Sequence, residues 1–486
     1  MTVDKGPGAP FINQDSQTPE NFSKTALIVV PEIHDKRSKH NGPDSHLSAD
    51  FQKDSSHTDR SDKEKIEEII GLAEAISLSV VSVLEFNVRR PAAASLFGKG
   101  QLETVAQEIE SVNPDVVIIN HVLSPVQQRN LEKRWNAKVI DRTGLILEIF
   151  GERAQTKEGK LQVELATLKY ARSRLVRSWT HLERQRGGLG FVGGPGETQL
   201  ELDKRLINER IDRLEKDLEQ VRKTRHLQRK RREQSAIPVI SLVGYTNAGK
   251  STLFNRLTGE SIFAKNLLFA TLDPTVRQID FSEGEEALIS DTVGFISDLP
   301  TDLIAAFRAT LEQIQYADVI LHVRDISSED TDAQAQDVAN VLDGLGIHYN
   351  NDNRVIEAWN KIDLVEDNNR QALSRKAGLT NGPPAVIISA VSGEGLEDLK
   401  NQILETIHQD DVRLKISLPS SEGRAMSWLH SHARVLNKKI DENTIEFIVD
   451  IDQAGFQKFK SEFPELIENH IVSIDRGNEC KSREKV

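Results

Sequence analysis

The sequence predicts an α/β protein built from several domains, and three patterns support this. Apolar runs suited to buried strands alternate with stretches of helical spacing between about residues 25 and 155. Two long stretches of apolar heptads follow, between residues 160 and 232. A glycine-rich loop, 244–252, then separates the apolar run 239–243 from another helical stretch. A length of 486 residues is enough for about three domains.

Charge and cysteine usage narrow the class of protein. A formal net charge of −13 excludes a uniformly basic nucleic-acid binder, so any RNA contact has to come from local basic segments. Cys480 is the only cysteine, which excludes an internal disulfide framework and favours a reducing compartment. The sequence has neither a signal-peptide core nor an apolar run long enough for a membrane span. We therefore expect a soluble cytoplasmic protein with at most peripheral membrane association.

The first predicted domain is a small parallel α/β domain over residues 25–158. Residues 1–24 are polar and predict a disordered tail, and the polar stretch 34–62 predicts a disordered insert. The rest alternates between strand and helix signals, which indicates a parallel sheet covered by helices. We expect strands at 26–30, 78–84, 116–119 and 139–140, and helices at 63–76, 102–109 and 125–135. We interpret Gly98-Lys99-Gly100 as a strand-to-helix turn rather than as an anion site.

Residues 159–235 predict an antiparallel helical hairpin. Apolar residues recur every seven positions in both halves, at Leu161, Leu168, Leu175 and Leu182, and then at Leu200, Ile207, Leu214 and Val221. The connecting segment 186–196 is too glycine-rich for a helix and too long for a simple turn, so it is a candidate functional tip.

Basic residues gather on this hairpin. The second helix ends in the basic run 222–232, and the first helix contains Lys169, Arg172, Arg174, Arg177, Arg184 and Arg186. RNA phosphates are natural partners for such residues. The alternative is that these side chains solvate an exposed helix or pair with the acidic residues around 215–219.

The loop Gly244-Tyr245-Thr246-Asn247-Ala248-Gly249-Lys250-Ser251 predicts a phosphate-binding site. Glycines let the backbone wrap around phosphates and direct N–H groups towards them. Lys250 supplies a positive charge, and the Ser251 hydroxyl suits Mg²⁺.

Three later motifs identify the nucleotide. The segment Asp291-Thr292-Val293-Gly294 follows a strand, as expected of an aspartate that holds Mg²⁺ through water and a glycine near the γ-phosphate. Asn360-Lys361-Ile362-Asp363 follows another strand, and an aspartate there accepts from guanine donors that adenine lacks. Ser389-Ala390-Val391, after a further strand, can offer an N–H to the guanine oxygen. Their order predicts a P-loop GTPase domain over 236–409.

These motifs, together with residues 268–275 (LFATLDPT), 291–296 (DTVGFI), 193–203 (GGPGETQLELD) and 141–147 (DRTGLIL), resemble the HflX branch of the Obg-type translation GTPases over about residues 25–410. The resemblance implies a GTPase that binds the large ribosomal subunit and its RNA and splits stalled or idle ribosomes under stress. It also implies that Thr271 joins Ser251 on Mg²⁺, with Asp291 acting through water. The residues expected to contact GTP or GDP are Gly244, Tyr245, Thr246, Asn247, Ala248, Gly249, Lys250, Ser251, Phe269, Ala270, Thr271, Leu272, Asp273, Asp291, Thr292, Val293, Gly294, Asn360, Lys361, Ile362, Asp363, Ser389, Ala390 and Val391.

The sequence does not identify a residue that directly carries out catalysis. Lys250, Thr271 and Asn247 are expected to support the phosphates and the transition state. Phe295 stands where Ras-like enzymes have a glutamine that orients the attacking water, and its apolar ring cannot form that hydrogen bond. We therefore predict slow intrinsic hydrolysis that a ribosomal partner stimulates by ordering residues 269–275 and 294–301. Asn247 further suggests a K⁺ ion beside the phosphates.

Residues 410–486 predict a small C-terminal α+β module, with strands at 412–418, 444–451 and 471–474 and helices at 422–436 and 454–462. Together the segments predict a monomer whose GTP binding and hydrolysis regulate ribosome association. Two alternatives stay open: an RNA-binding assembly or quality-control factor in which GTP acts only as a conformational switch, and a GTPase of ribosome assembly or RNA modification.

Overall fold

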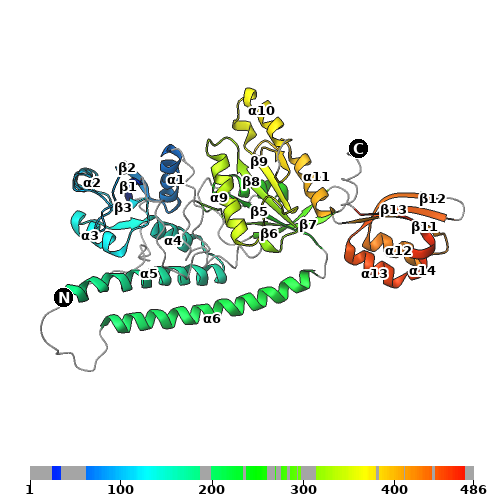
Figure 1. The fold of residues 1–486 in the computed structure, drawn as a ribbon, viewed down its shortest axis with the longest axis horizontal. Coiled ribbons are helices and arrows are strands. Elements are labelled where there is room, and N and C mark those ends of the chain that lie inside the picture. The colour runs from blue at the N-terminus through cyan, green and yellow to red at the C-terminus, as the bar shows by residue number, and fades with distance from the viewer. Residues whose placement is uncertain are drawn as a thin grey trace, which may run out of the picture. The chain divides into compact units, whose positions relative to one another are not determined.

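The computed structural model describes residues 24–33, 62–185, 199–233, 237–259, 269, 275–281, 285–292, 294–296, 314–378, 382–409, 411–440 and 444–476. Nearly all of the predicted tail and of the predicted insert, and the whole glycine-rich tip, lie outside these residues. The chain divides by its contacts into two units, 1–394 and 395–486. The described strands form three sheets (Figure 1).

The N-terminal region contains a parallel sheet of four strands in the order β2-β1-β3-β4, which confirms the expected α/β architecture. Alternate residues of β1 enter two different apolar clusters, because successive side chains of a strand point to opposite faces. Ile28 packs with one layer of helices and Leu27 with the other. The strands are β1 (Thr25–Ile33), β2 (Ser79–Val88), β3 (Val116–Ile119) and β4 (Val139–Asp141), and the helices are α1 (Asp62–Ala75), α2 (Lys99–Val112), α3 (Pro125–Trp135) and α4 (Arg142–Arg153).

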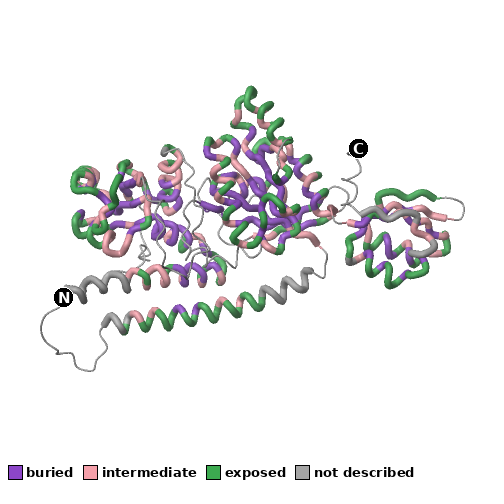
Figure 2. Tube along the Cα trace, in the orientation of Figure 1, coloured by how far each residue is buried: buried purple, intermediate pink, exposed green. Residues whose placement is uncertain are grey.

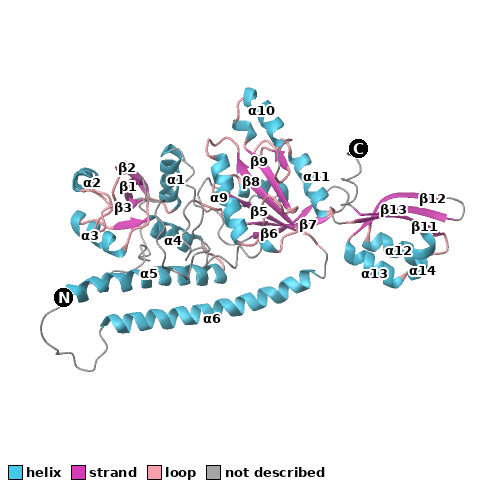
Figure 3. Ribbon diagram, viewed as in Figure 1, coloured by secondary structure: helices cyan, strands magenta, loops and turns pink. Residues whose placement is uncertain are grey.

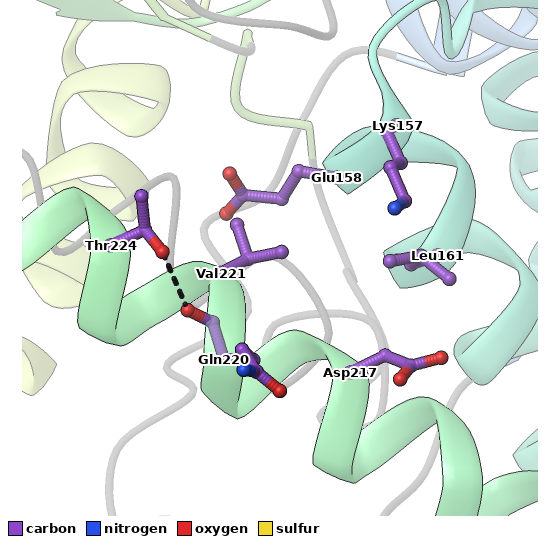
Figure 4. Close-up of a pocket in the computed structure, with 7 residues that line it drawn as sticks. All are labelled: Lys157, Glu158, Leu161, Asp217, Gln220, Val221 and Thr224. Carbon is purple, nitrogen blue, oxygen red and sulfur yellow. Dashed lines mark hydrogen bonds between the residues drawn. The ribbon is translucent and has the colours of Figure 1, made fainter.

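The predicted hairpin forms from two long helices, α5 (Lys157–Gln185) and α6 (Gln199–Glu233). Leu165 packs with Ile211 and Leu214, and the predicted heptad residues Leu161, Leu168 and Ile207 pack against this cluster. Early residues of α5 meet late residues of α6, so the helices are antiparallel. Figure 4 shows this at one end, where Lys157 and Leu161 line a surface pocket with Asp217, Val221 and Thr224.

The nucleotide region is a six-stranded sheet in the order β10-β9-β8-β5-β7-β6, parallel except for β6. Its central strands are almost fully buried, as Figure 2 shows, which explains their continuous apolar runs. The strands are β5 (Val239–Gly244), β6 (Thr275–Asp280), β7 (Glu286–Asp291), β8 (Val319–Asp325), β9 (Val355–Asn360) and β10 (Ala385–Ile387); the helices are α7 (Lys250–Thr258), α9 (Thr331–Gly344), α10 (Asp367–Ala377) and a short 3₁₀ helix (Ile362–Leu364). Strand β5 lies between β7 and β8, and the strand order reverses beside it. Doubly wound sheets bind their ligands at this position, outside the carboxyl ends of the strands.

The second unit contains α11 (Leu396–Ile407) and an antiparallel sheet in the order β12-β13-β11-β14 (Figure 3). The expected helix 422–436 was wrong at its end, because α12 stops at His432 and residues Arg434–Ile440 form a strand. That strand is an exposed edge containing lysines, so its sequence shows no regular apolar alternation. The elements are β11 (Val412–Pro419), α12 (Gly423–His432), β12 (Arg434–Ile440), β13 (Thr444–Ile451), α13 (Gln453–Glu462), α14 (Pro464–His470) and β14 (Ile471–Arg476).

Candidate nucleotide site

Two glycines shape the phosphate loop between β5 and α7. Gly244 has φ +149°, and a Cβ there would lie 2.3 Å from the carbonyl oxygen of Val323 on the neighbouring strand. Gly249 has φ +96°, and its Cβ would lie 2.2 Å from the side-chain nitrogen of Asn360. Both positions therefore exclude any side chain. Asn247, also in the left-handed region at φ 61°, forms the exposed tip of the loop.

Lys250 extends back into this loop. Its Nζ donates to the carbonyl oxygens of Gly244 at 3.1 Å and Tyr245 at 2.7 Å, and the residue is only 6% exposed. Burial lowers the pKa of the Lys250 ammonium to about 8, and the carboxylate of Asp291 opposes that shift. The first turn of α7 and this ammonium together favour an anion inside the loop.

Ser251 and Asp291 bring two hard oxygen donors together beside the phosphate loop. The Ser251 hydroxyl donates to a carboxylate oxygen of Asp291 at 2.9 Å, and Asp291 is 3% exposed at the end of β7. A hydroxyl and a carboxylate, both hard oxygen donors, fit Mg²⁺. Ser251 would bind the ion directly, and Asp291 would hold it through water.

The segment after β7 lies directly over the phosphate loop. Thr246 N–H donates to the Phe295 carbonyl at 2.7 Å, and Phe295 N–H donates to the Gly244 carbonyl at 3.1 Å. A Cβ on Gly294 would lie 2.9 Å from Thr246 Cγ2 and 3.0 Å from Lys250 Nζ, so a side chain there would push the loop or the lysine away. The Phe295 side chain packs in an apolar cluster with Val243, Ile314 and Ile320.

Asn360 joins the phosphate loop to the far side of the site. Its amide nitrogen donates to the Ala248 carbonyl at 2.9 Å, and its side-chain oxygen accepts from Ala390 N–H at 2.9 Å. The neighbouring Lys361 has φ 68°, and its ammonium pairs with Asp325 at 2.6 Å. Asp363 is exposed, as a carboxylate that receives a base must be.

The structure therefore brings the phosphate loop, Asp291, Asn360 and the loop after β10 together at one edge of the sheet. Ser389 is buried and its hydroxyl accepts from Ser392 N–H at 3.0 Å, whereas Val391 is 72% exposed. Five predicted GTP contacts lie outside the described residues: Ala270, Thr271, Leu272, Asp273 and Val293.

Phe269 requires a different interpretation. Its ring is 3% exposed and meets the ring of Phe150 on α4 edge to face, with centroids 4.8 Å apart. It thus belongs to the apolar cluster under the N-terminal sheet. Its contact with GTP stays a prediction.

Three of the basic residues expected to meet RNA are occupied within the protein. Lys169 pairs with Glu215 at 2.7 Å, Arg172 donates to Asn208 at 3.2 Å, and Arg174 pairs with buried Asp141 at 2.6 Å. The predicted alternative of pairing with the acidic residues around 215–219 is therefore correct for Lys169, whereas Arg172 and Arg174 have other partners within the protein. The side chains of Arg177, Arg184, Arg186 and residues 225–232 lie outside the described part of the chain.

Sequence reasoning missed the partners of Tyr245. Its hydroxyl donates to Glu68 of α1, and Glu68 also pairs with Arg142. Arg142 belongs to the segment 141–147 that supported the family resemblance, but nothing in the sequence indicated its partner. Across the residues that the structure describes, no group of three or more His, Cys, Asp or Glu side chains is arranged to hold a metal ion, and no helix could cross a membrane.

Three family models and several known proteins match most of this chain. Residues 63–151 match the model of a GTP-binding GTPase N-terminal domain, 153–232 that of a GTP-binding GTPase middle region, and 239–361 that of a 50S ribosome-binding GTPase. The GTPase HflX of Magnetococcus marinus is 46% identical over 397 residues, covering 82% of this chain and 90% of that protein. The GTPase HflX of Escherichia coli is 39% identical over 412 residues, covering 85% and 95%.

A solved structure, a GTP-binding protein from Sulfolobus solfataricus in complex with GDP, is 24% identical and covers 79% of this chain and 99% of that one, with a TM-score of 0.42. The family follows from the three family models and from the two HflX relatives, which are 46% and 39% identical to this chain. The chain is therefore a GTP-binding, GTP-hydrolysing member of the HflX family of GTPases.

Proposed function

We propose that the protein uses GTP binding and hydrolysis to regulate its hold on the large ribosomal subunit, and that it splits stalled or idle ribosomes under stress. The match of residues 239–361 to a 50S ribosome-binding GTPase is the observation that supports this most directly. The hairpin α5–α6, which ends in the basic run 222–232, would contact ribosomal RNA. In this proposal the protein acts as a cytoplasmic monomer.

The chemistry of the site follows from its described groups. Water attacks the γ-phosphorus of GTP, the bond to the β–γ bridging oxygen breaks, and GDP and phosphate leave. Lys250 and the N–H groups of the phosphate loop stabilise charge on the phosphates, and Gly294 lies close to Lys250. Mg²⁺, held by Ser251, Thr271 and, through water, Asp291, would neutralise charge on the β and γ oxygens.

Guanine selection falls to Asn360, Asp363 and the loop after β10. Asp363 would accept from the ring N–H and the amino group of guanine, and adenine would leave this carboxylate without those donors. Asn360 does not need to touch the base, because its two hydrogen bonds already hold the phosphate loop and Ala390 in register.

Slow hydrolysis by the free protein is part of the proposal. Phe295 is 3% exposed and packs in the core of the nucleotide domain, so its side chain cannot orient the attacking water. A ribosomal partner would order the segments 269–275 and 294–301 and complete the site. Turnover of the free protein that is already maximal and does not change when large subunits are added would contradict this.

A monovalent cation could supply part of the missing charge. Asn247 sits exposed at the tip of the phosphate loop, where its side-chain oxygen can help bind K⁺ against the phosphates. Turnover should then be faster in potassium than in sodium buffer at equal ionic strength. Equal rates would exclude this role for Asn247.

Ribosome pelleting tests the proposal. Large subunits are sedimented with the protein bound to a non-hydrolysable GTP analogue, bound to GDP, or without nucleotide. The proposal expects the analogue to give the strongest co-sedimentation. Equal binding in all three states would contradict nucleotide control of ribosome binding.

A second assay addresses the alternative of an RNA-binding factor in which GTP is only a conformational switch. If the analogue alone splits ribosomes as completely as GTP does over many rounds, hydrolysis is not needed and the switch alternative is favoured. A Lys250→Ala variant that still co-sediments without nucleotide dependence would also favour that alternative.

A further inference from the structure

The phosphate loop is attached to a second domain through the side chain of its second residue. Tyr245 is 6% exposed, and its ring packs in the apolar cluster of the N-terminal domain, together with Ile146 and Phe150. Its hydroxyl donates to a carboxylate oxygen of Glu68 on α1. The loop conformation therefore depends on groups outside the nucleotide domain.

Glu68 bridges two side chains. One carboxylate oxygen accepts from Tyr245, and the other pairs with the Arg142 guanidinium, which also donates to the Asn120 side chain at 2.8 Å. The side chains of Arg142 and Glu68 are 6% and 13% exposed. Because water scarcely reaches this bridge, its hydrogen bonds are directional and poorly replaced by solvent.

Arg142 follows Asp141, and the two side chains bind different elements. Asp141 is fully buried and caps α4 by accepting from Gly144 N–H at 2.8 Å. It also accepts from Tyr170 at 2.5 Å and pairs with Arg174 at 2.6 Å, both on α5. The end of β4 therefore binds the hairpin through Asp141 and the phosphate loop through Arg142 and Glu68.

The backbone of Tyr245 transmits its position to the chemical groups of the site. Its carbonyl accepts from Lys250 Nζ at 2.7 Å, and the next N–H, of Thr246, donates to Phe295 at 2.7 Å. A shift of Tyr245 would thus move both the ammonium that meets the phosphates and the segment that follows Asp291.

A second contact fixes α1 on the nucleotide domain one helical turn away. Ser328, in the loop after β8, donates its hydroxyl to Glu64 at 2.7 Å. Glu64 and Glu68 are spaced i and i+4, so they share one face of α1. This face therefore touches the nucleotide domain at two separate loops.

We propose that Glu68 is a positioning residue for the phosphate loop, acting through Tyr245, and that the Asp141–Arg142 pair makes nucleotide retention depend on how α5 is seated. The proposal rests on GTP binding and not on the proposed ribosomal role, so it is tested on the free protein. A failure here leaves the ribosome-pelleting experiment unaffected.

The test measures dissociation of a fluorescent GDP analogue from the full-length protein in stopped flow. Tyr245→Phe removes only the hydroxyl, Glu68→Gln removes only the charge, and a third protein combines both changes. Each single variant should release GDP about tenfold faster, the effect of losing one hydrogen bond to a charged group. The double variant should be no faster than the faster single variant, because both changes break the same contact.

Glu67→Gln is the matched control, because Glu67 lies beside Glu68 on α1 but is 65% exposed and pairs only loosely with Lys63, at 3.9 Å. Its GDP release should stay within about twofold of the parent protein. Thermal melting of every variant separates positioning from simple destabilisation. Release is measured well below the melting temperature of each variant, where Tyr245→Phe is folded and should still release GDP faster.

Two results would overturn the positioning role. One is unchanged GDP release from Tyr245→Phe, which decides the matter even if Glu68→Gln fails to fold. The other is a double variant whose effect is the product of the two single effects. The link to α5 is tested by Tyr170→Phe, which removes the hydroxyl that meets Asp141 and should also accelerate release; an unchanged rate refutes that link.

Discussion

Acid should destabilise the nucleotide domain through one buried imidazole, His322 on β8. Its Nδ1 lies 2.5 Å from the Tyr349 hydroxyl, which in turn lies 2.5 Å from the Glu357 carboxylate. Because the single tyrosine proton is donated to Glu357, the imidazole donates from Nδ1 to the tyrosine oxygen. Burial lowers the pKa of His322 to about 3, against the opposing effect of the Glu357 carboxylate.

The sign and size of the effect follow from proton linkage. The ordinary histidine pKa is 6.5, so between pH 6.5 and about 3 the unfolded chain binds a proton that the folded domain does not. Stability therefore falls as the pH is lowered through that window. Between pH 7 and pH 5 the loss from His322 is about 2 kcal/mol. Burial raises the pKa of Glu357, but opposing effects led by the Arg324 guanidinium bring the pKa below 4.5. The stability that the Glu357 carboxylate contributes is therefore lost only at lower pH.

Hydrogen exchange of the β8 and β9 amides at pH 7 and pH 5, corrected for intrinsic rates, would measure this loss locally in the nucleotide-free protein. His322→Asn keeps a donor for Tyr349 but cannot be protonated. Its free energy of unfolding should therefore fall by about 2 kcal/mol less between pH 7 and pH 5 than that of the parent protein. His430→Asn, an exposed change in the second unit, is the control. An acid loss in His322→Asn equal to that of the parent would refute the reasoning.

Three further changes have definite expected outcomes. Gly249→Ala places a Cβ 2.2 Å from the Asn360 amide nitrogen at a residue with φ +96°. It should weaken GTP binding more than tenfold, as measured by titration calorimetry. Unchanged affinity would mean that the loop relaxes freely. Asn360→Ala removes two buried hydrogen bonds and should destabilise the nucleotide domain by about 2–3 kcal/mol. Amide exchange in α7 should then be faster. Protection equal to that of the parent protein would show that the two loops keep their positions without this side chain. Phe295→Gln should cost about 2–4 kcal/mol of stability and give no faster hydrolysis, because the position faces the core; a gain in single-turnover rate would contradict the buried placement.

The sequence alone predicted where the nucleotide motifs lie in the fold. Its motifs are local, and each follows an apolar run that can only be a buried strand, so their order along the chain places Gly244, Asp291 and Asn360 at one sheet edge. The parallel N-terminal domain and the heptads of the hairpin followed from periodicity in the same way. The exposed edge strand β12 did not, because its lysines face solvent and give no regular pattern.

Tertiary structure alone decided which faces meet. Phe269 is placed in the N-terminal core and Arg174 beside Asp141, although their sequence contexts suggested a nucleotide contact and an RNA contact. Tyr245 and Glu68 are separated by 177 residues, and no local pattern indicates that a phosphate-loop tyrosine and a helix glutamate will share a buried hydrogen bond. Such pairings depend on the packing of whole domains, whereas strand, helix and loop propensities are set by neighbours in the chain.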